Sequence, residues 1–376
     1  MTPITKTTKR AEAPSMNHPA RKQTSWGWLS TAWSRYSYIF VFAMILLVYA
    51  ITIQAGGNKF TWGHITAILS SQNTVIVGTI ALGMAMVVIT GQIDLSVGSA
   101  LVLTTGVTMM VFNVTGSLAL MVLAALATGM MCGLINGVLA GYAKMPPFIV
   151  TLGTMLIYRS LTLSSVREIS PDITGSSSSQ FALSGKHEAL YDFLRMQFGT
   201  GSLRLNGVKI VPYITFLFLA LVLVFLLVMC KTKYGKSVYA VGSNERTARL
   251  VGIRVQRVKV SVFVLTGLLV GFAALMQACK IGNVTPASSG KSYEMYAIAA
   301  VVLGGISMAG GSGSLLGVLF GALSYATINF IIVSIPALST DIQDMFQGLV
   351  LIVVILIQTV GPVVKERLHA LRTRRG

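Results

Sequence analysis

Charged side chains are scarce in this sequence, and acidic ones are the scarcest. Only 11% of the 376 residues are charged, and Asp and Glu together number 11, whereas about 25% of residues are charged in an average soluble protein. The hydrophobic class makes up 54% of the chain, and the mean hydropathy is +0.75. This composition excludes an ordinary water-soluble protein.

Cysteine and histidine are also few, with three and four residues respectively. Cys132, Cys230 and Cys279 do not have the spacing of metal ligands, so the sequence predicts no metal site. Two Gly-Lys-Ser triplets, at 235–237 and 290–292, lack the earlier Gly of a phosphate-binding loop. We therefore expect no bound nucleotide, no cofactor and no catalytic residue.

Apolar runs close to the length that crosses a bilayer, about 20 residues, recur along the chain. They predict an all-α, polytopic transmembrane bundle of about ten spans, with Gly-rich broken helices. The predicted spans are 38–55, 74–89, 95–112, 118–142, 148–166, 212–230, 260–279, 293–309, 315–334 and 345–360. The second, third and eighth are short or interrupted by Gly, and are candidates for re-entrant segments.

Basic residues are unevenly distributed, and the net charge is +18. About two thirds of the 29 Lys and Arg residues fall in the two tails and in alternate loops, above all in the segment 231–259. Because cytoplasmic loops of membrane proteins are enriched in Lys and Arg, we predict that both termini are cytoplasmic. The basic excess then reflects topology, and we expect no nucleic-acid partner.

The apolar runs and the distribution of Lys and Arg divide the chain into segments. A basic tail spans 1–37, the transmembrane domain spans 38–361, and a second basic tail spans 362–376. Within the transmembrane domain, an outer loop lies near 167–211 and an inner loop near 231–259. Asp341 and Asp344 fall on the outer side, just before the tenth predicted span.

Glycine recurs every four positions in several spans. The repeats are Gly129, Gly133, Gly137 and Gly141 in the fourth span, Gly267 and Gly271 in the seventh, and Gly313, Gly317 and Gly321 in the ninth. Helices in a membrane approach closely where small residues align on one face, so we interpret these repeats as packing seams. Sliding of the seams during a transport cycle is the alternative.

Two carboxylates lie at the starts of apolar runs. The Asp94 side chain can accept hydrogen bonds from the free N–H groups at the start of the third span, as an N-cap. Glu294 begins the eighth span and can act in a similar way. A charge in such a position also suits a proton or ion site in a secondary transporter, which is the alternative.

The inner loop 231–259 contains a short capped helix. Asn244 can cap a helix from Glu245 to Leu250, and Gly252 can end it. We expect Glu245, Arg246 and Arg249 to face the cytoplasm, and Ala248, Leu250 and Val251 to form an apolar side. An ordinary solvated loop is the alternative, but a capped amphipathic helix favours a docking site for a soluble partner.

Four stretches of the sequence, in order, resemble the permease subunits of ribose-type monosaccharide ABC importers, a family that also serves xylose, arabinose and galactosides. They are Ile93–Ser99, Gly133–Gly137 with Pro147–Met155, Tyr234–Ile253, and Val302–Ser314, and the likeness covers roughly 65–360. The sequence departs from the family's usual pattern at Gln92, at Ser243 and in the length of the segment 167–211.

The resemblance implies an importer that moves a pentose or hexose inward across the bacterial cytoplasmic (inner) membrane. It implies a separate ATP-binding subunit on the cytoplasmic side, a periplasmic or extracellular sugar-binding protein, and a second permease copy, identical or different. The chain itself is then no enzyme, and membrane lipid is its other partner. By the same resemblance, the residues that contact the ATPase are Asn244, Glu245, Arg246, Arg249 and Gly252.

The residues that we expect at helix breaks or along the pore are Asp94, Ser96, Gly98, Asn136, Thr151, Thr154, Gly304, Gly305 and Ser307. Of these, Asn136, Thr151, Thr154 and Ser307 are the expected polar contacts to the sugar. The alternative function is a proton- or ion-coupled secondary transporter that uses Asp94 or Glu294.

Overall fold

The computed structural model describes residues 27–183, 187–205 and 208–335, together with a few isolated positions between 345 and 356. The chain divides after Ser37 into two units. Apart from residues 27–37 of the first helix, the elements discussed below belong to the second unit. Most of the predicted tenth span (345–360), Asp341 and Asp344, the tail 362–376 and most of the tail 1–37 lie outside the described residues.

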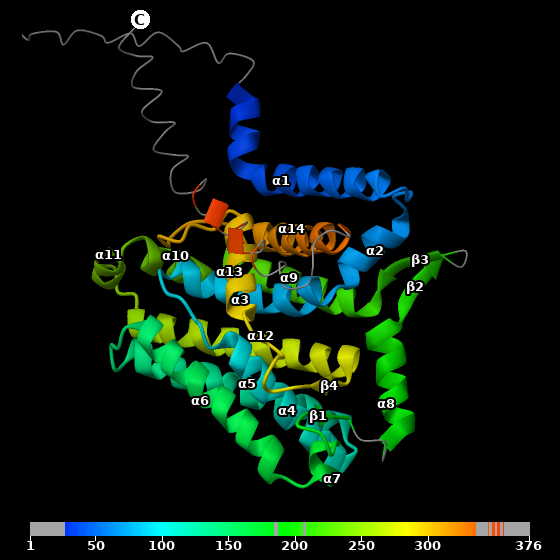
Figure 1. The fold of residues 1–376 in the computed structure, drawn as a ribbon. Coiled ribbons are helices and arrows are strands. Elements are labelled where there is room, and N and C mark those ends of the chain that lie inside the picture. Colours follow the sequence, from blue (N-terminus) through cyan, green and yellow to red (C-terminus); the bar gives the residue numbers. More distant parts are fainter. Residues whose placement is uncertain are drawn as a thin grey trace, which may run out of the picture. The chain divides into compact units, whose positions relative to one another are not determined.

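Helices make up most of the described chain (Figure 1). The helices are α1 (Gly27–Ala55), α2 (Trp62–Ser70), α3 (Gly78–Ile89), α4 (Val97–Thr115), α5 (Leu118–Gly141), α6 (Pro147–Glu168), α7 (Pro171–Thr174), α8 (Glu188–Leu194), α9 (Tyr213–Lys231), α10 (Lys233–Ser243), α11 (Glu245–Leu250), α12 (Val255–Ile281), α13 (Tyr293–Leu303) and α14 (Leu315–Val333). Two short π-helical turns occupy Asn73–Val77 and Arg195–Thr200. The polytopic helical class predicted from the sequence is confirmed.

Seven of these helices are long and apolar enough to cross a membrane, namely α1, α4, α5, α6, α9, α12 and α14. An eighth crossing is possible if the pair Trp62–Ser70 and Asn73–Ile89, which is bent by 47°, counts as one broken span. These helices leave large side chains on their outer faces, such as Leu123 on α5 and Leu156 on α6. Apolar residues in such positions suit contact with lipid or with another membrane helix.

The predicted eighth span, 293–309, is wrong in its length. Its helix α13 stops at Leu303 after 11 residues, which is about 16 Å at 1.5 Å per residue and too short for a hydrocarbon core of about 30 Å. Gly304 and Gly305 end it, and Gly305 has the left-handed φ of +78° that a helix C-terminus commonly uses. The chain then turns through 304–314 before α14 begins.

Helices α5 and α12 pack at backbone contact. A Cβ on Gly129 would collide with the carbonyl of Gly267, and a Cβ on Gly267 would collide with the carbonyl of Gly129. Gly133 meets the carbonyl of Phe263 in the same way, and Gly137 and Gly141 lie against Val260. The four-residue repeat therefore lies along one helix–helix contact.

A second close contact joins α13 to α14. Gly317 lies against the carbonyl of Gly304, and Gly321 against that of Ala300. Gly313 does not continue this seam as the sequence suggested, because it precedes the first residue of α14. It has φ +127° and packs on Ile306 within the turn 304–314.

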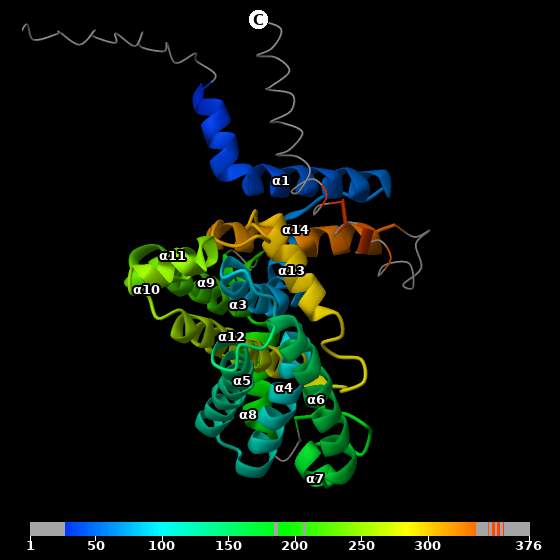
Figure 2. The same ribbon diagram turned by 90° about the vertical axis from the view of Figure 1, so that its left-hand side faces the viewer.

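Short elements gather at the two ends of α12. At the end where α12 begins, α10 and α11 lie beside each other and α10 contacts α9 (Figures 1 and 2). At the other end, strand β4 (Asn283–Val284) pairs with β1 (Phe181–Ala182). The predicted outer loop also contains α7, α8 and a hairpin of β2 (Ser202–Leu205) and β3 (Val208–Pro212).

Candidate functional site

The first helix break, residues 90–96, separates α3 from α4. The Asp94 Oδ1 atom accepts hydrogen bonds from the backbone N–H and the hydroxyl of Ser96, at 2.9 and 2.7 Å. Ser96 is the N-cap residue of α4, so Asp94 does not cap the helix as expected. It lies two residues too early, and its carboxylate instead fixes the turn that leads into the helix.

Asp94 and Ser96 belong to a chain of buried side chains that links three helices. The Asn136 amide on α5 donates to the Ser96 hydroxyl at 2.8 Å, and the Thr154 hydroxyl on α6 donates to Asn136 Oδ1 at 2.7 Å. We call Asp94, Ser96, Asn136 and Thr154 the buried polar cluster; each is at most 5% exposed. Since a buried polar group that loses its partner destabilises the fold, the cluster fixes how α4, α5 and α6 meet.

The structure brings together five of the residues predicted at a break or the pore, but it turns them inward. Thr151, also fully buried, reaches the carbonyl of Ile93 at 3.5 Å. Asn136, Thr151 and Thr154 therefore satisfy protein groups here and are not exposed for contact with a sugar. Their role in this structure is to position the break.

Gly98 lies in the first turn of α4 and faces the segment that precedes α13. A Cβ there would meet the carbonyl of Gly290 and approach Glu294 Oε2 to 2.8 Å. The Arg159 guanidinium on α6 reaches the same segment and donates to the carbonyls of Pro286 (2.6 Å) and Ser289 (2.8 Å). Sequence reasoning missed this role of Arg159, although a charged residue inside the apolar run 148–166 was a signal for it.

The second break is the turn 304–314, and it touches the first. The backbone N–H of Gly311 donates to the carbonyl of Ile89, the last residue of α3, at 2.8 Å. Ser307 lies within the turn, where its N–H donates to Ser312 at 3.3 Å and its hydroxyl accepts from Ala309 at 3.3 Å. Gly304, Gly305 and Ser307 are thus separate from the buried polar cluster.

Helix α10 packs directly on the place where the two breaks meet. Gly242 lies against the carbonyl of Ile89 so closely that a Cβ would collide with it. The Tyr239 hydroxyl donates to the carbonyl of Gly313 at 2.8 Å, and the Ser243 hydroxyl donates to that of Gly311 at 3.4 Å. Any displacement of α10 must therefore move both breaks or lose these contacts.

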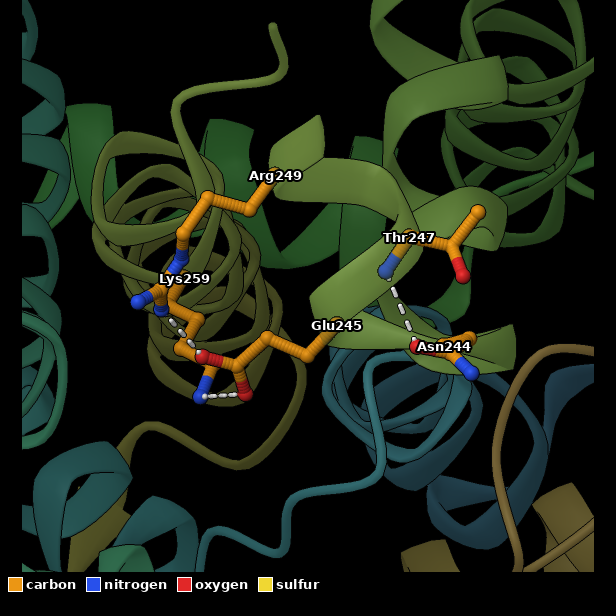
Figure 3. A network of polar contacts seen from close by, with 5 residues as sticks. All are labelled: Asn244, Glu245, Thr247, Arg249 and Lys259. Carbon is orange, nitrogen blue, oxygen red and sulfur yellow. Dashed lines mark hydrogen bonds and ion pairs between the residues drawn. The ribbon is translucent and has the colours of Figure 1, made fainter. Parts of the chain in front are cut away.

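Helix α11 has the predicted ends, and Figure 3 shows its start, where Asn244 meets Thr247. Asn244 Oδ1 accepts the backbone N–H of Thr247 at 3.0 Å, and Gly252 follows the helix with φ +83°. The Glu245 carboxylate lies between Arg249 and Lys259, at 2.9 Å from each. The hydrogen bond from Lys259, together with the two positive charges, holds the pKa of Glu245 below its usual range.

The expected apolar side of α11 is wrong in part. Ala248 is buried, but Leu250 is 86% exposed and Val251 is 71% exposed. Arg246 is also exposed, whereas Glu245 turns sideways toward α12. The short helix packs on its neighbours through Ala248, and the aliphatic side chains of Leu250 and Val251 at its C-terminal end are exposed to solvent.

The described residues contain no group of three or more His, Cys, Asp or Glu placed to hold a metal ion. Within the described part of the chain, Cys132, Cys230 and Cys279 are free thiols. The candidate functional site consists of the two helix breaks that touch each other, helix α10 that packs on them, and the exposed end of α11.

Comparison with known proteins agrees with a transport role for such an arrangement. Residues 66–355 match the family described as "Branched-chain amino acid transport system / permease component". The chain is 34% identical over 284 residues to the fructose import permease protein FrcC of Rhizobium meliloti, covering 74% of this chain and 73% of that one. A search of solved structures found no match.

Two further relatives are permeases for other sugars. The chain is 38% identical over 282 residues to the ribose import permease protein RbsC of Bacillus subtilis (strain 168), covering 74% of this chain and 80% of that one. It is 32% identical over 337 residues to the xylose transport system permease protein XylH of Escherichia coli (strain K12), covering 77% and 84%.

Proposed function

The chain belongs to the family of branched-chain amino acid transport system permease components, and we propose that it is the transmembrane permease subunit of an ABC importer for a monosaccharide. Its similarity to fructose, ribose and xylose permeases supports this substrate class. The subunit carries out no bond chemistry, and a separate subunit hydrolyses ATP. Selectivity for a particular pentose or hexose is set by the contacts that the sugar makes with the binding protein and with the open pore.

We further propose its surroundings. A cytoplasmic ATP-binding subunit contacts the α10–α11 end, a sugar-binding protein contacts the opposite end, and a second permease copy completes the pore in the bacterial cytoplasmic membrane. The excess of Lys and Arg in the tails and in 231–259 supports cytoplasmic termini. The exposed apolar faces of α5 and α6 support contact with lipid and with the second copy.

The observation that carries the mechanism is the path from α11 to the helix breaks. The exposed side chains of Leu250 and Val251 form an apolar surface on α11 that a partner can contact. Asn244 joins α11 directly to α10. Helix α10 in turn is packed on Ile89 through Gly242 and bonded to the turn 304–314. A partner that shifts α11 when it binds ATP would thereby shift the ends of both broken helices and switch the pore.

The test replaces this exposed apolar surface of α11 and leaves the buried residues of the permease unchanged. In Leu250→Asp, in Val251→Asp and in the double variant, we expect co-purification of the ATP-binding subunit and ATP-driven sugar uptake to fall at least tenfold. The melting temperature of the isolated permease should stay unchanged, because both side chains are exposed. Leu203→Asp, an exposed residue of β2, is the matched control and should keep the complex intact. Full uptake in the double variant would contradict the proposal.

A further inference from the structure

An apolar groove of about 340 Å³ lies between α5, α9 and α12, and the last residue of α8 also lines it. Among the described residues, its wall contains only apolar side chains and one thiol, for example Leu118 and Val122 of α5, Leu217 of α9, and Phe272 and Cys279 of α12. The volume falls within the range of about 300–1,000 Å³ that is typical of ligand sites. Because these side chains offer a ligand no hydrogen bond, the groove suits a hydrocarbon chain.

The groove opens on the outside of the helical bundle. Val122 in its wall is 40% exposed, and the next residue of α5, Leu123, is 63% exposed. On α9, the exposed Phe216 stands beside Leu217. Helices α5, α9 and α12 are each long and apolar enough to cross a membrane, so the mouth of the groove lies on a surface that suits contact with lipid.

The depth of the groove matches one leaflet of a bilayer. All three helices have an end at this level, since α5 begins at Leu118, α9 begins at Tyr213 and α12 ends at Ile281. Phe272 lies nine residues before the end of α12, which is about 14 Å at 1.5 Å per residue. Half of a hydrocarbon core of about 30 Å is about 15 Å, so an acyl chain of one leaflet spans the groove.

A second, more open hollow of about 500 Å³ lies next to the groove, at the end of the bundle opposite α10 and α11 (Figure 1). Three aromatic residues and one amide line it, namely Phe193, Gln197, Tyr213 and Phe216. The residues that directly follow the three aromatic ones line the groove, namely Leu194, Ile214 and Leu217. The two hollows therefore share the end of α8 and the start of α9 as a common wall, and together they offer space for two acyl chains.

Two cations stand at the level of the helix ends. Arg195 and Lys280 directly follow Leu194 and Cys279, which line the groove. They are neighbours, because a Cβ on Gly199 would lie 3.4 Å from Arg195 Cγ and 3.6 Å from Lys280 Cα. Neither forms a salt bridge with a described residue. Cations in this position lie where the phosphate of a lipid headgroup lies, and Lys and Arg are the residues that bind phosphate.

We propose that the two hollows hold the acyl chains of one anionic phospholipid, such as phosphatidylglycerol, with its phosphate at Arg195 and Lys280. The lipid fills the space between α9 and the α5–α12 pair, and the aromatic rings of Phe193, Tyr213 and Phe216 surround it at the level of the membrane interface, where aromatic residues are enriched. The proposal goes beyond the proposed function and does not depend on which cargo the permease carries.

The first test compares three lipids. The full-length permease is purified in detergent, and the retained lipids are counted and their affinities measured by native mass spectrometry. We expect each chain to retain one phosphatidylglycerol, at least about tenfold more tightly than phosphatidylcholine, because the two cations select a net negative headgroup. Lysophosphatidylglycerol, which has the same headgroup but one acyl chain, should also bind at least about tenfold more weakly, because it fills only one hollow.

The second test separates the headgroup from the chains. Arg195→Gln combined with Lys280→Gln should lower the affinity for phosphatidylglycerol to that for phosphatidylcholine and leave phosphatidylcholine unchanged. Lys291→Gln, which removes an exposed cation that lines neither hollow, is the control and should change nothing.

Val122→Asn places an amide at the mouth of the groove and should weaken both lipids alike. Leu123→Asn is its matched control, since Leu123 is the adjacent, more exposed residue of α5 and does not line the groove. Phe216→Asn should reduce phosphatidylglycerol to the affinity of the one-chain lipid. Melting temperatures of the variants in detergent, measured without added lipid, show that a loss of binding does not come from unfolding.

Three outcomes would overturn the site. One is a permease that retains no lipid, as expected if residues 345–360 fill the groove. The second is a dimer of the permease that Val122→Asn dissociates and Leu123→Asn does not, which would assign the groove to a second copy. The third is an equal loss of lipid in Val122→Asn and Leu123→Asn, which would show that lipid covers the helices without a specific site.

Discussion

The break at 90–96 and the turn at 304–314 touch at Ile89, yet different kinds of contact hold them. Around the first, Asp94, Ser96, Asn136 and Thr154 bond to one another across three helices and are buried. The second is made largely of glycine; Gly305, Gly310, Gly311 and Gly313 all have positive φ. Its bonds to neighbours run through backbone groups, as in Gly311 to Ile89.

This difference indicates a division of labour between the two breaks. Side-chain bonds between helices fix a single arrangement, because each bond that breaks leaves a buried polar group unpaired. A glycine-rich turn is conformationally permissive, and its residues reach several backbone conformations at small cost. We infer that the first break is a fixed anchor and that the second is the hinge.

The largest effect is expected where both breaks depend on one contact. Gly242→Ala places a Cβ against the Ile89 carbonyl and should destabilise the permease by about 3 kcal/mol, the upper part of the usual range for overpacking. Sugar uptake should be lost with it. Thermal unfolding and uptake are measured together, with Gly153→Ala as control, since no described atom outside its own helix turn lies within 4 Å of a Cβ there.

Asn136→Leu tests the anchor itself. It removes the hydrogen bonds to Ser96 and Thr154, and should cost about 2 kcal/mol at about 1 kcal/mol for each bond lost. Combining it with Thr154→Val should cost less than the sum of the two single changes, because the two residues share one bond. Additive losses in melting experiments would show that the cluster does not act as a unit.

Substitutions of Asp94 distinguish two roles of this residue, namely a structural anchor of the first break and a proton site. Asp94→Asn retains an oxygen that accepts both Ser96 donors, so uptake should stay within a fewfold of wild type, while Asp94→Leu should cost about 1–2 kcal/mol. A proton-coupled transporter would lose uptake in both variants, since neither side chain titrates. A well-folded but inactive Asn variant would thus favour the rival function.

Gly305→Ala is expected to have the smallest effect on stability and to be the most informative about the hinge. No described atom beyond its chain neighbours lies within 4 Å of a Cβ at this position, so the cost is the left-handed φ alone, about 1 kcal/mol. If 304–314 is the hinge, uptake should slow more than this loss of stability explains. Gly305→Asn should be milder in both measurements, and equal uptake in all three proteins would assign the hinge elsewhere.

Much of this arrangement follows from the sequence by simple rules. The positions of α4, α5, α6, α9 and α14 agree with their apolar runs to within a few residues, because hydropathy over about 20 residues is a local property. The ends of α11 were predicted as well, since a cap and a terminal Gly are set by adjacent residues. Glycine repeats likewise indicated which face of α5 packs.

The features that the sequence did not predict have a common physical origin, because each depends on backbone angles or on contacts between distant parts of the chain. The apolar run 293–309 continues past Gly304 and Gly305, and hydropathy contains no information about their backbone angles. The sequence indicated no partner for Arg159, because its acceptors lie 127 and 130 residues away in the chain. The exposure of Leu250 depends on how a six-residue helix docks through Ala248, which no local pattern specifies.

The Ile89 carbonyl oxygen, which Gly311 bonds and Gly242 covers, has a thermodynamic consequence. If the occupant of the pore and the soluble subunit on α11 both bias the same contact, their binding equilibria are linked. The factor by which sugar in the pore changes the affinity of the ATP-binding subunit must then equal the factor by which that subunit changes the affinity for sugar. Reciprocity of this kind would let the transporter sense its cargo without any group that touches both ligands.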